Sequence, residues 1–107
     1  MITQSDVRAR ALALPEAEEQ DHFGKPSFRV RGKIFATLPP DGRHLHVFLD
    51  EPAVRMVVAN DPEAFEELRW GARLAGVRIR LAAARPAAVR DLLFASWRRK
   101  APKSLTR

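Results

Sequence analysis

Between residues 27 and 49 the hydrophobic pattern repeats every second residue, and this feature limits the possible folds most. In Phe28-Arg29-Val30-Arg31 the apolar residues alternate with arginines, which is typical of a β-strand with one buried face. Turn signals divide the region twice, at Gly32 and at residues 39–42 (Pro-Pro-Asp-Gly). Residues 33–38 and 44–49 are again strand-like. The region therefore predicts three sequential antiparallel strands.

Helical signals flank this region on both sides. Thr3 and Asp6 have the spacing of a capping box, which predicts that a first helix begins there. Asp50, followed by a proline, is the predicted N-cap of a second helix. Pro86 begins the last predicted helix, whose basic final turn ends before Pro102.

The segments between these elements have weaker signals. Residues 15–21 are acidic, and we expect an exposed loop there. Residues 62–68 begin with the same cap-plus-proline signal as the second helix, which predicts a short helical piece. We expect an irregular stretch to begin at Trp70-Gly71, and residues 76–81 alternate as a further strand.

The order of these elements predicts an α+β fold in a single domain, residues 1–107, with an antiparallel sheet packed on one face by the N- and C-terminal helices. The chain has no cysteine, which excludes a disulfide framework, a thiolate metal site and a thiol nucleophile. The longest apolar run is too short for a membrane span, and the N-terminus does not resemble a signal peptide. We therefore expect a monomer in the cytoplasm that makes no membrane contact.

The formal net charge of +6 hides a segregation of charge along the chain. Residues 1–68 carry 8 basic and 12 acidic side chains, whereas residues 69–107 carry 11 basic side chains and one acid, Asp91. Such a basic segment indicates a surface that faces a polyanion, and nucleic acid is its natural partner. A GC-rich genome would also raise the arginine content, although this explains the segregation less easily.

Two sets of basic residues are candidates for contacts with a phosphate backbone. The strand set alternates along the chain and is expected on a common sheet face: Arg29, Arg31, Lys33, Arg78 and Arg80. The C-terminal set comprises Arg98, Arg99, Lys100, Lys103 and Arg107. The alternatives are a solvated sheet face that is merely charged and basic residues that stabilise the end of the last helix. Nothing resembles a base-reading helix-turn-helix, so we expect binding that is independent of sequence or weakly specific.

Three groups of short motifs occur in order along the chain. They are His22-Phe23-Gly24-Lys25-Pro26-Ser27-Phe28 with residues 32–38, Asp61-Pro62-Glu63-Ala64-Phe65 with Trp70-Gly71, and Ala95-Ser96-Trp97 with Ala101-Pro102-Lys103. Together they resemble the MmcQ/YjbR family over residues 6–105. The resemblance implies a fold similar to that of CyaY, a frataxin homologue, and a bacterial DNA-binding protein whose β-hairpins contact the duplex as a "double wing". Family members often carry a Gly-aromatic pair where this chain has Leu74-Ala75-Gly76, so a site built on that aromatic would be altered here.

An alternative function is a small-ligand or protein-interaction module with a pocket near His22, Lys25 and Trp70. Lys25 lies in an apolar setting that could line a cleft, although its neighbours Gly24 and Pro26 could equally shape the entry into the first strand. Trp70 could stack on a base or serve a structural role.

Catalysis and metal binding have little support in the sequence. His44 and His46 point the same way from their strand, but no spacing identifies a third ligand, so we expect no metal site. The chain has no nucleophile elbow, P-loop or dinucleotide fingerprint. We therefore expect no catalytic residues and no cofactor.

Overall fold

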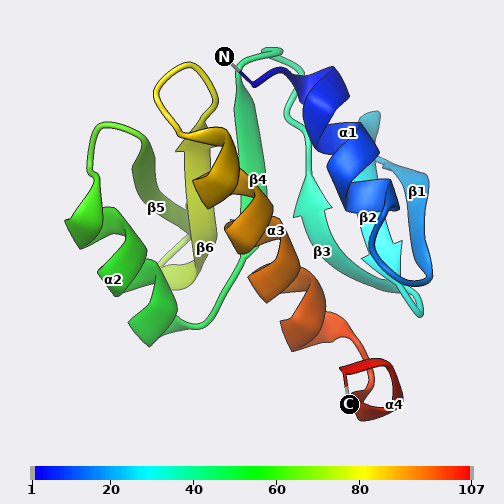
Figure 1. The fold of residues 1–107 in the computed structure, drawn as a ribbon. Coiled ribbons are helices and arrows are strands. Elements are labelled where there is room, and N and C mark those ends of the chain that lie inside the picture. Colours follow the sequence, from blue (N-terminus) through cyan, green and yellow to red (C-terminus); the bar gives the residue numbers. More distant parts are fainter. Residues whose placement is uncertain (1, 107) are drawn as a thin grey trace.

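The computed structural model describes residues 2–106, which form a six-stranded sheet and four helices (Figure 1). The elements are α1 (Gln4–Leu12), β1 (Ala17–His22), β2 (Lys25–Val30), β3 (Lys33–Thr37), β4 (His44–Phe48), α2 (Glu51–Asn60), β5 (Phe65–Trp70), β6 (Arg73–Arg80), α3 (Pro86–Lys100) and α4 (Lys103–Thr106). The strands lie in the order β1-β2-β3-β4-β6-β5, and all neighbours are antiparallel. The predicted α+β class is confirmed.

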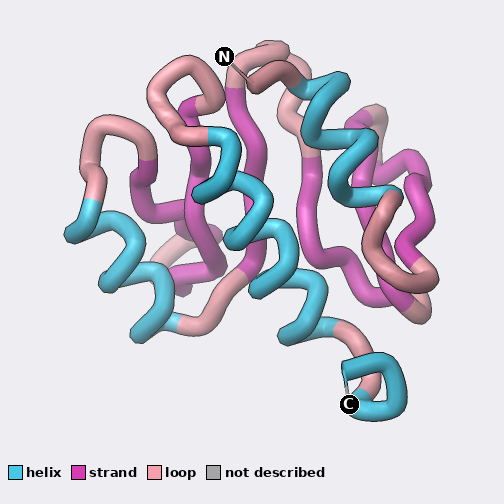
Figure 2. Tube along the Cα trace, viewed as in Figure 1, coloured by secondary structure: helices cyan, strands magenta, loops and turns pink. Residues whose placement is uncertain are grey.

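The helices α1, α2 and α3 lie on one face of the sheet (Figures 1 and 2). In the described chain no helix covers the other face, which we call the open face. The predicted packing of the N- and C-terminal helices on one face is therefore observed, with α2 as an additional cover beside β5 and β6. None of the helices within residues 2–106 is long and apolar enough to cross a membrane.

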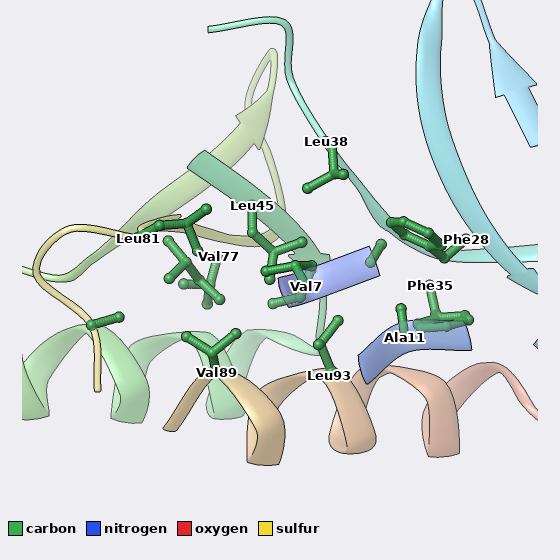
Figure 3. Packing of buried hydrophobic residues seen from close by; sticks show 14 of the residues in the cluster. Val7, Ala11, Phe28, Phe35, Leu38, Leu45, Val77, Leu81, Val89 and Leu93 are labelled. Carbon is green, nitrogen blue, oxygen red and sulfur yellow. The ribbon is translucent and has the colours of Figure 1, made fainter. Parts of the chain in front are cut away.

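The core forms where the apolar stripes of the helices meet the inner face of the sheet (Figure 3). Its fully buried members include Val7, Ala11, Phe28, Phe35, Leu45, Val77, Val89 and Leu93. Trp97 of α3 is also buried, and its indole N–H donates to the Pro15 carbonyl oxygen at 3.0 Å. Each buried large apolar side chain contributes about 1.5–3 kcal/mol, so the layers are held chiefly by this contact.

Capping contacts confirm the predicted helix starts. The backbone N–H of Asp6 donates to Thr3 Oγ1 at 3.1 Å, and the Asp6 carboxylate accepts from the Thr3 N–H at 2.8 Å. The Asp50 carboxylate accepts from the backbone N–H of Ala53 at 3.1 Å. Pro86 stands in the first turn of α3, as its missing N–H allows.

The acidic segment at residues 15–21 is not the exposed loop that the sequence predicts. Ala17–His22 form β1, an edge strand that pairs with β2 along its whole length. Backbone groups make this ladder, so a poor intrinsic strand propensity does not prevent it. The acidic side chains stay at the surface, where Glu19 accepts from Arg8 Nε at 2.8 Å. Charge on an edge strand also discourages pairing with another chain.

The predicted helical piece at residues 62–68 is also wrong. Asp61 ends α2, and its carbonyl oxygen accepts from the Phe65 N–H at 3.0 Å, which closes a turn rather than opening a helix. The chain then continues as β5 and pairs with β6. The stretch expected to be irregular at Trp70-Gly71 is the tight turn of this hairpin, and Gly71 supplies its positive φ of 62°.

The sheet divides into two halves at its centre. In the described chain β3 and β4 pair only at Ala36–Val47 and Thr37–His46, and beyond these pairs the strands diverge (Figure 1). β4 and β6, in contrast, approach closely at Gly76. This approach is possible because Gly76 has no Cβ, which would otherwise run into the carbonyl oxygen of Val47. The half β1-β2-β3 and the half β4-β6-β5 are thus joined by a short seam.

Candidate functional site

A cleft of about 580 Å³ lies along this seam, a volume within the range of small-ligand sites. Both halves of the sheet and the last turn of α3 contribute to its walls. The lining residues are basic, aromatic, aliphatic or neutral polar: His22, Phe23, Lys25, Lys33, Ile34, Thr37, His46, Phe48, Leu68, Trp70, Arg73, Ala75, Arg99 and Lys100. No aspartate or glutamate is among these residues. The cleft is therefore suited to an anion.

Four of the lining residues form what we call the cation cluster: Lys33, Arg73, Arg99 and Lys100. They come from β3, β6 and α3, and none has an ion-pair partner within residues 2–106. Burial lowers the pKa of Lys100, and the positive charges of Arg99, Arg73 and Lys33 lower it further. The four cations thus repel one another, and the described protein supplies no carboxylate to offset the repulsion.

Aromatic side chains stand at two places along the cleft. Trp70 is 57% exposed and lies against the Phe48 ring, with 5.3 Å between the ring centroids. Phe23 is 91% exposed, and its ring centroid lies 4.7 Å from that of His22. Phe23 belongs to the β1–β2 turn and Trp70 to the end of β5, so each half of the sheet contributes one exposed aromatic.

His46 of β4 also lines the cleft. Its Nε2 is buried without a hydrogen-bond partner in the described chain. Burial, followed by the positive charges of Arg78 and Lys25, lowers the pKa of His46 to about 4. The ring is therefore neutral at pH 7 and adds no charge to the cleft.

The structure brings the three predicted pocket residues, His22, Lys25 and Trp70, to this one cleft. His22 and Lys25 are cross-strand partners in the β1–β2 hairpin, and Trp70 is the cross-strand partner of Arg73 in the β5–β6 hairpin. Residues more than forty positions apart therefore line the same space. Ala75 also lines the cleft, and it belongs to the segment Leu74-Ala75-Gly76, which replaces the Gly-aromatic pair expected from the family resemblance.

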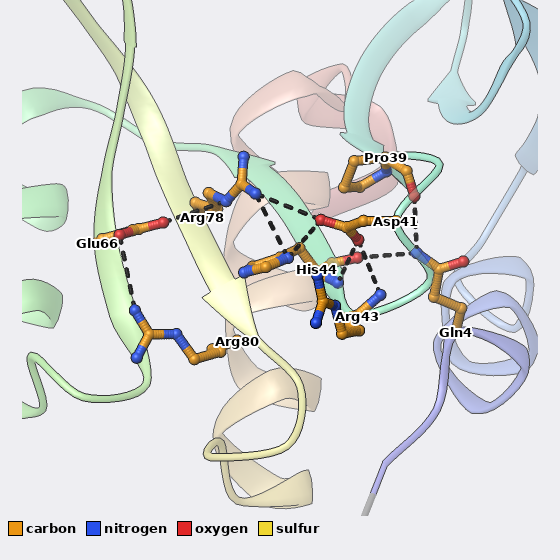
Figure 4. Close-up of polar contacts among 8 residues, drawn as sticks. All are labelled: Gln4, Pro39, Asp41, Arg43, His44, Glu66, Arg78 and Arg80. Atoms are coloured by element: carbon orange, nitrogen blue, oxygen red, sulfur yellow. Dashed lines mark hydrogen bonds and ion pairs between the residues drawn. The ribbon is translucent and has the colours of Figure 1, made fainter.

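At the other end of β4 and β6, a network of acidic and basic residues forms what we call the paired end (Figure 4). Its members are Asp41, His44, Glu66, Arg78 and Arg80. Asp41 Oδ2 lies 2.6 Å from His44 Nδ1 and 3.3 Å from Arg78 Nη2. Glu66 lies 3.1 Å from Arg78 Nε and 3.8 Å from Arg80 Nη2. Both predicted β6 cations therefore already have carboxylate partners.

The predicted common face of Arg29, Arg31 and Lys33 does not form. A bulge shifts the register between β2 and β3, and Arg31 lies in the turn with a φ of 50°. Arg31 Nε donates to Glu16 at 2.6 Å, and Arg29 Nε donates to Ser27 Oγ at 3.2 Å. Only Lys33 of this trio lines the cleft.

The C-terminal basic set is divided as well. Arg99 and Lys100 line the cleft, whereas Arg98 and Lys103 do not. Arg107 lies outside the described residues. Helical geometry accounts for part of the division, because successive residues point about 100° apart around the axis of α3.

Phe23 belongs to the apolar setting expected around Lys25, whereas Arg73 and Phe48 are members of the site that the sequence did not indicate. The available signal was Trp70-Gly71: taken as a tight hairpin turn, it would have placed Arg73 opposite Trp70. Nothing local indicates that Phe48 supports Trp70, because this contact depends on the pairing of β4 with β6.

The described residues form neither a metal-binding group nor an activated serine hydroxyl. Within residues 2–106 no group of three His, Asp or Glu side chains is placed to hold a metal ion. The hydroxyls of the two buried serines, Ser27 and Ser96, donate to the backbone carbonyls of Gln20 and Leu93. Neither serine is paired with a general base.

The YjbR family pattern matches residues 12–99, which is most of the chain. The chain belongs to the YjbR family. This confirms the resemblance drawn from the motifs. Among solved structures, this YjbR-family chain is similar to Deinococcus radiodurans protein DR2400, described as a DUF419 domain, with a TM-score of 0.75. The two are 21% identical, and the match covers 91% of this chain and 77% of that chain, so the likeness concerns the fold alone. No curated protein matches the chain.

Proposed function

We propose that this YjbR-family protein binds nucleic acid and that the cation cluster holds phosphate groups in the cleft. The observation that carries the proposal is the convergence of Lys33, Arg73, Arg99 and Lys100 with no carboxylate among the lining residues. Phosphate offers the negative charge and the acceptor oxygens that these side chains lack, and charge-assisted hydrogen bonds are stronger than neutral ones. Binding would also release counterions from the nucleic acid.

As expected from the sequence, basic side chains would contact the phosphate backbone, but we propose that those of the cleft make the principal contacts. Arg31, Arg78 and Arg80 would have to leave a carboxylate partner before they could hold a phosphate. Arg98 and Lys103 have no ion-pair partner within residues 2–106, and we propose them as secondary contacts beyond the cleft. Contacts of this kind carry little sequence information, so the proposed binding is sequence-independent or weakly specific.

We propose that the protein binds nucleic acid in the bacterial cytoplasm. One chain supplies every residue that lines the cleft, so a monomer is sufficient for the proposed contacts. The engaged serine hydroxyls give no support to nucleophilic catalysis, and we propose a binding protein rather than an enzyme.

Fluorescence anisotropy with a labelled random-sequence oligonucleotide tests this function. We expect binding near or below about 10⁻⁶ M in about 0.15 M salt, with a log-log salt slope of about −3 for the four cluster contacts. The pair Arg73→Glu and Lys100→Glu should weaken binding at least about tenfold, because it reverses two cluster charges. The matched control is Arg10→Glu with Arg85→Glu, two exposed cations outside the cleft without ion-pair partners in the described chain.

Either of two results would contradict the proposal. One is the absence of binding at low salt to both single and double strands. The other is an equal loss of affinity in the cleft pair and in the control pair, which would mean that only the net charge matters.

A second candidate function is the binding of a small anionic ligand. The cleft volume and the convergence of His22, Lys25 and Trp70 favour it. A thermal-shift assay with inorganic phosphate and a nucleoside diphosphate separates the two functions. Stabilisation by the diphosphate, without affinity for oligonucleotides, would support the second function and exclude the first.

A further inference from the structure

The two exposed aromatics of the cleft have no role that the fold explains. Phe23 and Trp70 are 91% and 57% exposed, although each would gain about 1.5–3 kcal/mol from burial. Both line the cleft that also holds the cation cluster. A grip on phosphate alone needs charge and donors, so it leaves these rings unexplained.

Phe23 occupies a backbone position that phenylalanine rarely adopts. Phe23 and Gly24 form the two-residue β1–β2 turn, with φ values of 54° and 82°. Such turns favour asparagine, aspartate or glycine, because a side chain at positive φ is strained. The ring makes an edge contact with His22 but remains almost fully exposed. Folding alone would favour another residue here.

Trp70 contacts the Phe48 ring, tilted by 49° to it, and more than half of its side chain remains exposed. The Phe48 ring supports it at a centroid distance of 5.3 Å, and Arg73 is its cross-strand partner. An indole fixed in this way is a platform for a flat ring, with a cation beside it for the attached phosphate. His46 also lines the cleft and, because its pKa is lowered to about 4, adds no positive charge there at pH 7.

We propose that the cleft binds single-stranded nucleic acid, with unpaired bases stacked on Trp70 and Phe23 and the intervening phosphates held by the cation cluster. This inference rests on the proposed function and selects one form of nucleic acid. In a duplex the bases are stacked on one another, so their faces cannot reach the two rings. In a single strand every base offers a face, and such stacking favours binding without requiring a particular sequence.

Paired anisotropy titrations test the inference with a single strand of about 12 nucleotides and the duplex of the same sequence. We expect the single strand to bind at least about tenfold more tightly. Trp70→Leu should weaken single-strand binding about tenfold and duplex binding less than twofold, since leucine keeps apolar bulk but cannot stack. Phe94→Ala is the matched control, because Phe94 is 46% exposed on α3 and does not line the cleft.

Two further readouts report the stacked rings directly. Trp70 and Trp97 are the two tryptophans, and Trp97 is buried, so quenching of tryptophan emission by the single strand should disappear in Trp70→Phe. Phe23→Asn should raise the unfolding temperature, because asparagine tolerates positive φ, and should weaken single-strand binding. Opposite signs for stability and affinity would identify Phe23 as a binding residue rather than a structural one.

The outcomes separate this inference from the proposed function. Equal affinity for both forms, with Trp70→Leu without effect, would overturn the single-strand inference and leave nucleic-acid binding standing. No binding to either form would overturn both. If a mononucleotide competes as well as the single strand, the occupant is a free nucleotide and the inference is wrong. If inorganic phosphate alone competes as well, the rings take no part and the inference is also wrong.

Discussion

The two ends of strands β4 and β6 carry basic side chains of similar chemistry in opposite electrostatic settings. At the paired end, Arg78 and Arg80 face the carboxylates of Asp41 and Glu66. At the cleft end, Arg73 and Lys100 face other cations, and no carboxylate lines the space. Charge composition alone cannot distinguish these four cations, because Arg73, Arg78, Arg80 and Lys100 all belong to the basic part of the sequence, residues 69–107. The positions of two acidic residues make the difference.

A basic side chain without a carboxylate partner therefore indicates a functional site more clearly than a basic side chain that already has one. Pairs such as those at the paired end can contribute to stability, and their charge is largely offset. The cation cluster contributes repulsion instead, so folding gives no reason for its convergence. Sites of this kind, where a local arrangement works against stability, are where function is expected.

The largest effect should follow from a change that disturbs the pairing of β4 with β6, the two strands that connect the paired end with the cleft. Gly76→Ala introduces a Cβ into the carbonyl oxygen of Val47 and forces β4 away from β6. We expect a loss of about 3 kcal/mol in the free energy of unfolding, measured by urea denaturation. Gly24→Ala is the control: it has open space around its Cβ and should cost about 1 kcal/mol, through its positive φ alone. Equal losses would mean that β4 and β6 do not approach closely.

At the paired end, removal of one charge should reduce stability clearly. Asp41→Asn removes the carboxylate that serves His44 and Arg78, and we expect a loss of about 1 kcal/mol in the free energy of unfolding, because these contacts form a network at the surface. The control Asp91→Asn acts on an exposed pair with Arg90, at 3.6 Å, and should change stability by less than about 0.5 kcal/mol. If both variants behave alike, the network at the paired end contributes nothing.

His46 of β4 lies near charged residues of both the paired end and the cleft, and its pKa depends on them. Its ionisation should therefore change the stability of the protein with pH. Its folded pKa of about 4 lies below its ordinary value of 6.5, so the unfolded chain takes up a proton first as the pH falls. Stability is therefore full above pH 6.5 and declines towards pH 4. We expect a loss of about 1 kcal/mol, reduced from the full linkage value because the ring is partly exposed. Denaturation at several pH values should show this slope in the native protein and not in His46→Gln.

The smallest effect is expected within the cation cluster and has the opposite sign. Lys100→Gln should raise the free energy of unfolding by about 0.5 kcal/mol, because it removes repulsion from Arg99, Arg73 and Lys33. The same variant should bind single-stranded DNA more weakly. Thermal denaturation in low salt checks the first effect, and anisotropy checks the second. A loss of stability would mean that the four cations of the cluster do not destabilise the folded protein.

The predictable part of the fold is the part encoded by near neighbours. Thr3, Asp50 and Gly32 specify their caps and turn within a few residues, so α1, α2 and the β2–β3 hairpin follow from the sequence. β1 and β5 do not, because their residues form strands only through pairing with β2 and β6. The acidic and Asp-Pro patterns of these segments are local signals that tertiary pairing overrides.

The site divides in the same way. His22, Lys25 and Trp70 lie within short glycine-containing motifs, and the apolar setting of Lys25 made a pocket there a candidate. The pairing of Arg31 with Glu16 and of Arg78 with Asp41 joins residues distant in sequence, and no spacing rule reveals it. The sequence therefore identifies which residues are basic, and the fold decides which of them remain available.

The central claim is that nucleic acid binds at the cleft and not at the paired end. Backbone amide chemical shifts, followed during titration with a single-stranded oligonucleotide, test it most directly. We expect the largest changes at residues 22–25, 33–37, 46–48, 68–75 and 99–100, with little change at residues 41–44 and 78–80. Changes centred on residues 41–44 and 78–80, or spread evenly over the helices, would contradict it.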